Sequence, residues 1–127
     1  MLTRKDLIEH CLTYADAYED YPFDEDRNDP AAWTVMRHKS NHKSFALIYE
    51  RGGCLNVNVK CAPAEADFLR GVYPAVTAGY HMNKEHWNGI AIDGSIPDGE
   101  IFGWIEESFE LTAPKIQKKK SIDKTKG

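Results

Sequence analysis

The sequence lacks the long apolar run that a membrane span requires. No hydrophobic stretch in its 127 residues approaches the ~20 residues needed to cross a bilayer. The first residues, Met1 to Asp6, carry charge at once and contain none of the apolar core of a signal peptide. These absences predict a cytoplasmic protein with no membrane partner.

Cysteine is scarce and unpaired in the sequence. Cys11, Cys54 and Cys61 are odd in number and include no C-x-x-C pair, which argues against a disulfide framework and against a cysteine-rich zinc site. We interpret all three as reduced residues of the core or of strands.

Catalytic signatures are missing as well. The chain has no G-x-S-x-G elbow, no P-loop, no dinucleotide fingerprint and no H-E-x-x-H motif. Lys60 lies beside Cys61 and could lower a thiol pKa, but no histidine is placed in sequence to orient the thiol. His81 and His86 flank a turn, yet their spacing is not a metal-ligating signature. The sequence therefore predicts a protein that is not an enzyme, with no cofactor and no metal site.

Positive charge is sparse over most of the chain. Residues 1–112 carry 10 Lys or Arg against 19 Asp or Glu, a net charge of −9, whereas residues 113–127 carry six Lys against one Asp, a net charge of +5. Seven of the carboxylates fall between Asp16 and Asp29, without the order of a calcium-binding loop. We expect this stretch to be a solvated acidic loop, which the Lys-rich end of the chain could also contact. An acidic body of this kind could bind DNA only through a local basic face or through that end.

Hydrophobic periodicity predicts eight elements in one domain. Thr3 can cap a first helix, and Pro63 suits the first turn of a second helix. The predicted helices are 3–18, 63–73 and 97–111, and the predicted strands are 33–38, 45–50, 55–60, 76–81 and 87–93. Lys39 to Lys43 and Arg51 to Gly53 supply hairpin turns, and 19–30 is a loop.

The order α-β-β-β-α-β-β-α predicts an α+β fold. We expect a two-layer sandwich, in which a five-stranded antiparallel sheet carries its helices mainly on one face. Residues 1–112 form this single domain, and residues 113–127 are predicted to be a mobile Lys-rich tail. We expect a monomer.

One segment concentrates far more chemistry than a turn requires. Gly79 to Trp87 combines aromatic, imidazole, amide and ammonium groups. With Tyr21 to Phe23, Lys43 to Leu47 and Ser108 to Thr112, this segment resembles the MmcQ/YjbR family. The resemblance runs from Thr3 to Thr112 and implies the same element order and a double-wing DNA-binding motif. Family members usually carry Gly after the Pro-Phe pair, where this chain has an aspartate and a longer loop.

The candidate DNA-binding surface consists of residues on strand ends and turns. If two hairpin tips project from the same side, their Lys and Arg side chains would hold phosphates, Asn83 could reach a base edge or a phosphate, and Tyr80 and Trp87 could stack on an unpaired base. The candidates are Arg37, Lys39, Lys43, Lys60, Asn83, Lys84, Tyr80 and Trp87. The alternative is that these turns are merely polar, that the lysines protect sheet edges, and that the aromatic residues belong to the core.

Two other functions remain open. The open sheet face or the acidic loop could hold a segment of another protein, as in a protein-interaction or chaperone-like domain. A pocket between sheet and helices, with Trp33, Tyr49 and Trp87 as walls, could instead bind a small ligand.

Overall fold

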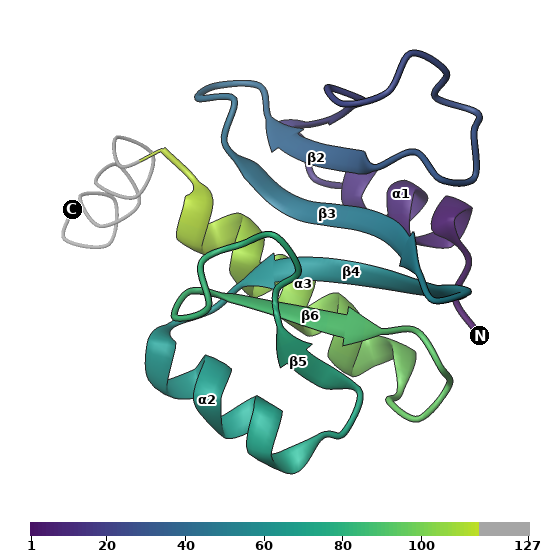
Figure 1. Cartoon of the computed structure of the whole chain (residues 1–127). Helices are drawn as coiled ribbons and strands as arrows, with labels where there is room; N and C mark the ends of the chain where they lie inside the picture. Colours follow the sequence, from purple (N-terminus) through teal and green to yellow (C-terminus); the bar gives the residue numbers. More distant parts are fainter. Residues whose placement is uncertain (115–127) are drawn as a thin grey trace, which may run out of the picture.

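The structure of the protein is a computed structural model, in which residues 1–114 are described. Three helices and six strands follow one another along the chain (Figure 1). They are α1 (Arg4–Leu12), β1 (Ala17–Asp20), β2 (Thr34–His38), β3 (Ser44–Arg51), β4 (Cys54–Lys60), α2 (Pro63–Val72), β5 (Val76–Ala78), β6 (Trp87–Ala91) and α3 (Asp98–Thr112). The predicted tail lies, from residue 115 onward, outside the described residues.

The six strands form one sheet in the order β1-β2-β3-β4-β6-β5, and all neighbours are antiparallel. Figure 1 shows α1 and α3 behind this sheet and α2 beside β5 and β6 at its lower edge. Within residues 1–114, no helix covers the face turned toward the viewer. The predicted α+β class, with helices on one face of an antiparallel sheet, is thus confirmed, and one face of the sheet stays open. No helix in this part of the chain is long and apolar enough to cross a membrane.

The prediction of five strands is wrong, because the sheet has a sixth strand at its edge. Ala17 to Asp20 was predicted to be the end of the first helix and the start of a loop, but it pairs with β2 as strand β1. The Asp20 carboxylate also binds Arg37 Nε at 2.8 Å. Because these contacts come from a strand more than a dozen residues away, the local pattern of apolar residues gave no sign of them.

The first helix starts as predicted and ends early. Thr3 Oγ1 accepts a hydrogen bond from the Asp6 amide, while the Asp6 carboxylate accepts one from the Thr3 amide, which together make a capping box. The helix stops at Leu12, where the Thr13 hydroxyl donates to the His10 carbonyl oxygen. The chain then turns through Tyr14 into β1.

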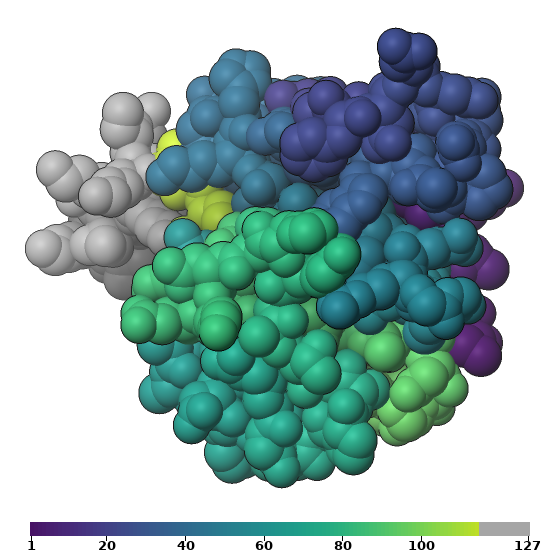
Figure 2. All heavy atoms as spheres, in the orientation of Figure 1, coloured from purple at the N-terminus to yellow at the C-terminus, as the bar shows by residue number. Residues whose placement is uncertain are grey.

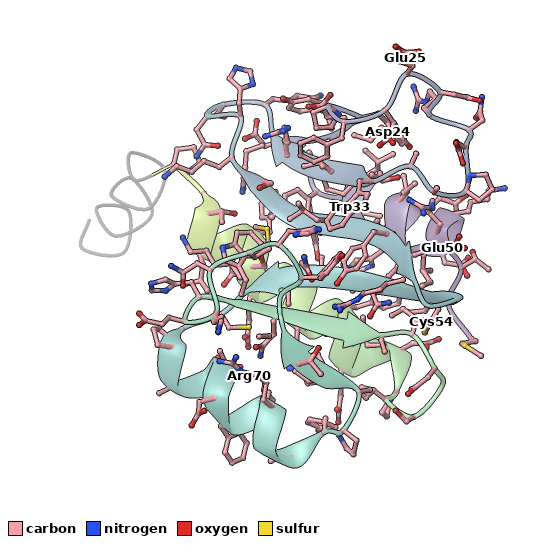
Figure 3. The ribbon with its side chains drawn as sticks, in the orientation of Figure 1. Asp24, Glu25, Trp33, Glu50, Cys54 and Arg70 are labelled. Atoms are coloured by element: carbon pink, nitrogen blue, oxygen red, sulfur yellow. The ribbon has the colours of Figure 1, made fainter. Side chains whose placement is uncertain are left out.

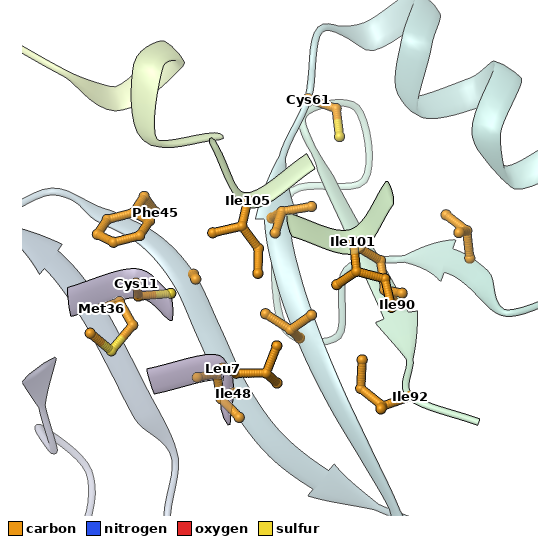
Figure 4. Close-up of a cluster of buried hydrophobic side chains, with 14 of the residues drawn as sticks. Leu7, Cys11, Met36, Phe45, Ile48, Cys61, Ile90, Ile92, Ile101 and Ile105 are labelled. Atoms are coloured by element: carbon orange, nitrogen blue, oxygen red, sulfur yellow. The ribbon is translucent and has the colours of Figure 1, made fainter. Parts of the chain in front are cut away.

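The core lies between the helices and the inner face of the sheet (Figure 4). Leu7 and Cys11 of α1 and Ile105 of α3 pack against Ile48 and Ile90 of the central strands, and all five side chains are at most 1% exposed. Burying an aliphatic side chain of this size contributes about 1.5–3 kcal/mol. This continuous cluster fixes the sheet on the helices and leaves the outer face available.

An irregularity in β3 lets two successive side chains face the core. The register with β2 moves from Met36↔Ala46 to Arg37↔Ser44, which leaves Phe45 without a partner in the ladder. A bulge of this kind rotates the strand locally. Phe45 is fully buried against Phe109 of α3, with ring centroids 4.9 Å apart.

Two polar side chains of α3 fasten the helix to the sheet end. Ser108 Oγ donates to the Phe45 carbonyl oxygen at 2.6 Å and accepts from the Lys60 amide at 2.8 Å. Thr112 Oγ1 lies 2.8 Å from Nε2 of the buried His38. Burial lowers the pKa of His38, although the nearby Asp16 carboxylate pulls it in the opposite direction.

Candidate binding site on the open sheet face

Three aromatic side chains gather on the sheet face that carries no helix. Trp33, just before β2, lies opposite Tyr49 of β3, and the two rings stack with centroids 4.2 Å apart and planes 7° from parallel. Tyr80, from the β5–β6 loop, lies 5.9 Å from Tyr49 and 6.2 Å from Trp33. They reach this face because alternate residues of a strand point to opposite sides, and the neighbouring Ile48 points into the core.

Hydrogen bonds hold the aromatic cluster from below. The Tyr49 hydroxyl donates to Asn58 Oδ1 at 2.9 Å, and Asn58 Nδ2 donates to the Tyr80 carbonyl oxygen at 2.9 Å. Burial raises the pKa of Tyr49, so its phenol stays protonated and remains a donor. Gly89 of β6 allows this arrangement, because a Cβ there would lie 3.0 Å from Asn58 Oδ1 and 3.3 Å from the Tyr49 hydroxyl.

The β5–β6 loop closes over the open face with an unusual backbone. His81 adopts a positive φ of 63°, and its ring lies 3.9 Å from that of Tyr80. The Arg51 guanidinium covers the Tyr80 ring at 3.8 Å, a favourable cation–π contact. At the base of the loop, a Cβ on Gly79 would lie only 2.9 Å from Trp87 Cβ, so a larger residue there would force the chain to shift.

A pocket of about 320 Å³ lies on this face, next to the aromatic cluster. Its walls come from the β1–β2 loop, from β3 and from the β5–β6 loop. They are Phe23, Trp33, Leu47, His81 and Met82. Figure 2 shows the β5–β6 loop, in green, standing out over the face turned to the viewer, with the blue segments of the β1–β2 loop above it.

The pocket wall contains one strongly exposed aromatic side chain. Phe23 is 68% exposed, and its ring meets that of Trp33 edge to face at 6.4 Å. Leu47, by contrast, is 6% exposed and forms the floor. An apolar pocket with an exposed aromatic wall above a rigid base is suited to an apolar or aromatic group.

The position of this pocket differs from the predicted one. One alternative from the sequence was a pocket between sheet and helices, walled by Trp33, Tyr49 and Trp87. The pocket instead lies on the opposite face, where Trp33 forms a wall and Tyr49 stacks on Trp33, while Trp87 pairs with Lys60 at the end of the sheet. Leu47 and Met82 were not predicted as site residues, because only the tertiary contact between β3 and the β5–β6 loop brings them together.

Acidic residues follow Phe23 of the pocket wall along the β1–β2 loop. Asp24 follows Phe23 and fastens the loop, since its Oδ2 accepts a hydrogen bond from the Trp33 amide at 2.9 Å. In Figure 3, Asp24 lies between Trp33 and Glu25, which points outward from the tip of the loop. Glu19 and Asp20 are neutralised by Arg27 and Arg37, at 2.9 and 2.8 Å.

The predicted DNA-binding residues lie at one end of the sheet. Because all neighbouring strands are antiparallel, the end of β2, the end of β4 and the start of β6 lie at the same end of the sheet. The β2–β3 turn and the β5–β6 loop therefore both lie at this end. Lys39 and Lys43 are exposed there, and Lys60 pairs with Trp87. None of the three has an ion-pair partner within residues 1–114.

The remaining candidates at this end are partly engaged within the protein. Arg37 binds the Asp20 carboxylate and the His42 carbonyl oxygen. Asn83 Oδ1 accepts from the Glu85 amide at 2.8 Å and shapes the loop. Lys84 is exposed, and its carbonyl oxygen accepts from Arg70 Nη2. Tyr80 belongs to the aromatic cluster on the open face, with its ring covered on one side by a guanidinium.

Two of the three cysteines are buried, and Cys54 is half-buried. Burial raises the pKa of Cys11 and of Cys61 to about 12, so these thiols carry almost no thiolate at neutral pH. Within residues 1–114, no group of three or more His, Cys, Asp or Glu side chains is placed to hold a metal ion. With its stacked aromatic base and its exposed Phe23 wall, the open-face pocket is the candidate site that the geometry favours.

Comparison with known proteins places this fold in a family. The model of the family described as YjbR matches residues 12–111, which include every residue of the pocket. The chain belongs to the YjbR family. This YjbR-family chain is 36% identical over 122 residues to YyaQ of Bacillus subtilis (strain 168), covering 88% of the chain and 99% of YyaQ. It is 28% identical to YjbR of Escherichia coli (strain K12), covering 86% of each.

Solved structures support the same fold for the YjbR-family domain. A crystal structure of a Pseudomonas syringae protein superposes with a TM-score of 0.75 at 29% identity, covering 88% of this chain and all of the other. A Deinococcus radiodurans protein superposes with a TM-score of 0.75 at 27% identity, covering 87% of this chain and 78% of the other.

Proposed function

We propose that this YjbR-family domain is a protein-interaction module, and that the pocket on its open sheet face takes an apolar or aromatic side chain from a segment of a partner protein. The observation that carries the proposal is the apolar pocket beside Phe23, which keeps 68% of its surface exposed. An exposed aromatic side chain at the wall of an apolar pocket is typical of a surface that a partner covers.

The pocket is prepared for binding. Trp33 and Tyr49 are stacked, and Tyr49 is bonded to the buried Asn58, so the base keeps its shape when a ligand enters. A preformed site loses little conformational entropy on binding. Burying one Leu or Phe side chain there would contribute about 1.5–3 kcal/mol. A single anchor of this kind supports weak, reversible association.

Small probes test the pocket directly. We expect N-acetyl-leucinamide and N-acetyl-tryptophanamide, titrated to millimolar concentration into ¹⁵N-labelled protein, to shift the amide signals of Leu47 and Met82 and the indole signal of Trp33. Phe23→Ala should weaken these shifts severalfold. Phe68→Ala is the matched control, because Phe68 is similarly exposed, at 65%, but lies on α2 away from the pocket. Equal effects of both variants would refute the proposal.

A second candidate function is DNA binding at the basic end of the sheet. The strand order favours it, because antiparallel pairing puts Lys39 and Lys43 of the β2–β3 turn at the same end of the sheet as Lys84 of the β5–β6 loop. Two projecting turns with free cations could contact phosphates on both sides of a groove. The net charge of −9 over residues 1–112 opposes this, because phosphate neutralisation supplies most non-specific affinity.

A further inference from the structure

We infer that the partner segment recognised by the open-face pocket is basic, with Lys or Arg flanking the apolar or aromatic side chain that enters the pocket. This inference rests on the proposed function and adds the chemistry of the partner. The recognising groups are the carboxylates of Asp24, Glu25 and Asp26, which we call the acidic rim. They follow Phe23 directly in the chain.

The acidic rim carries negative charge that no ion pair among residues 1–114 neutralises. Of the carboxylates in this loop region, those of Glu19 and Asp20 form ion pairs with arginines. Asp24 and Asp26 accept only backbone hydrogen bonds, from the amides of Trp33 and Asn28, both at 2.9 Å. Within residues 1–114, neither they nor Glu25 form an ion pair. Their charge is therefore available to a partner.

The rim is close enough to the pocket to act on the same ligand. Consecutive residues span at most about 3.6 Å each, so the backbone of Asp26 lies within about 11 Å of that of Phe23. The Asp24 bond to the Trp33 amide holds the start of the rim against the pocket wall. Figure 3 shows Glu25 at the loop tip, pointing into solvent. A Lys or Arg one or two residues from the anchoring side chain can reach these carboxylates.

Two cations near this face are held by contacts within the protein. The Arg51 guanidinium lies over the Tyr80 ring, 3.8 Å from its centroid. Lys84 follows Met82 in the β5–β6 loop, where its carbonyl oxygen accepts a hydrogen bond from Arg70 Nη2 of α2. At longer range, the net charge of −9 over residues 1–112 steers a cationic segment toward the domain. Because the rim is exposed and screened, its contribution should be modest, about 3–10-fold in affinity at low salt.

Four synthetic peptides of equal length separate the effect of the flanking charges from the effect of the central side chain that enters the pocket. The first three place phenylalanine between pairs of lysines, of serines or of glutamates, and the fourth places glycine between pairs of lysines. Each is titrated into the ¹⁵N-labelled full chain at about 20 mM and about 300 mM NaCl. We expect the lysine-phenylalanine peptide to bind about 3–10-fold tighter than the serine peptide at low salt and the glutamate peptide to bind weakest, with the differences shrinking at high salt.

Variants of the rim complete the test. Glu25→Lys combined with Asp26→Lys should remove the preference for the lysine peptide while the serine peptide binds as before. Asp67→Lys, on the exposed side of α2, is the control for charge reversal and should leave the preference in place.

The outcomes distinguish the two proposals. If the serine peptide binds at the pocket as tightly as the lysine peptide at low salt, the inference of a basic partner is wrong and the pocket stands. If the glycine peptide binds as tightly as its phenylalanine counterpart, with no shifts at Leu47 or Met82, the pocket is not the anchor and the proposed function fails. If N-acetyl-tryptophanamide binds tighter than every peptide, the site belongs to a small apolar ligand.

Discussion

Ser108 is a polar residue in a position where the helix pattern predicts an apolar one. Its hydroxyl is fully buried and serves two backbone groups of different strands, the Phe45 carbonyl in β3 and the Lys60 amide in β4. Both groups lie where the regular ladder ends, at the bulge and at the end of β4. A single hydroxyl therefore completes the hydrogen bonding of the sheet under α3.

Removing that hydroxyl should cost more than its size suggests. Ser108→Ala leaves the buried Phe45 carbonyl and the half-buried Lys60 amide without their partner, and we expect a loss of about 2–4 kcal/mol in the free energy of unfolding. Urea denaturation monitored by circular dichroism measures this. Ser95→Ala is the control, because Ser95 is exposed and bonds only Asp93, so it should change stability by less than about 0.5 kcal/mol. Similar values for both variants would contradict the assigned role.

At the scale of elements, the β5–β6 loop depends on close contact at its base. The Gly79 amide donates to the Trp87 carbonyl oxygen at 2.9 Å, and the glycine Cα faces the Trp87 side chain. The loop then carries Tyr80, His81 and Met82 over the open face. The shape of the pocket consequently depends on the close contact between Gly79 and Trp87.

Gly79→Ala should destabilise the protein and disturb the pocket together. The new methyl would lie 2.9 Å from Trp87 Cβ, so β5 and β6 must move apart, at a cost of about 1–3 kcal/mol. A methyl group on Gly103 of α3 would meet open space, so Gly103→Ala should stabilise the protein by about 0.5–1 kcal/mol. Thermal unfolding shows whether each variant is destabilised or stabilised, and the NMR amide signals of Met82 and His81 show whether the pocket changes. A Gly79→Ala variant as stable as the native protein would show that the loop adapts freely.

At the scale of the whole molecule, the distribution of charge bears on the choice between the two candidate partners, a protein segment and DNA. Residues 1–112 are acidic, yet the lysines that form no ion pair within residues 1–114 share one end of the sheet. If that end binds DNA, reversing Lys39, Lys43 and Lys84 to Glu should weaken binding to a labelled duplex by about tenfold or more. It should also flatten the salt dependence, whose log–log slope decreases by ~0.9 for each phosphate that the protein no longer neutralises.

Fluorescence anisotropy at several salt concentrations makes this measurement. Lys5→Glu, a reversal of an exposed lysine on α1, is the control for net charge. Changing Lys118, Lys119 and Lys120 to Gln tests the remaining cationic segment of the sequence. Binding that survives the sheet-end reversal and disappears with the second change would exclude the two turns as the DNA contact.

The sequence alone predicted most of the elements because their signals are local. The alternation of Leu55, Val57 and Val59 with polar residues predicted β4, and the 3.6-residue spacing of Ile101 and Ile105 predicted α3, each to within one residue. The α+β class followed from the order of these elements, whereas the family was predicted from the resemblance of separate segments such as Gly79 to Trp87. Strand β1 was missed because a four-residue edge strand is specified by its partner β2, and Tyr18 fits a helical spacing equally well.

Only the tertiary structure decided the site. Phe23, Leu47 and Met82 come from three segments with no common pattern, and they meet because the sheet order puts a loop from each side over one face. Which side chains are buried or paired also depends on folding. Nothing in the sequence distinguishes Arg37, which forms an ion pair with Asp20, from Lys43, which is exposed and forms no ion pair within residues 1–114. Local chain chemistry thus determined the elements and the charge, while the packing of distant residues decided where the pocket lies.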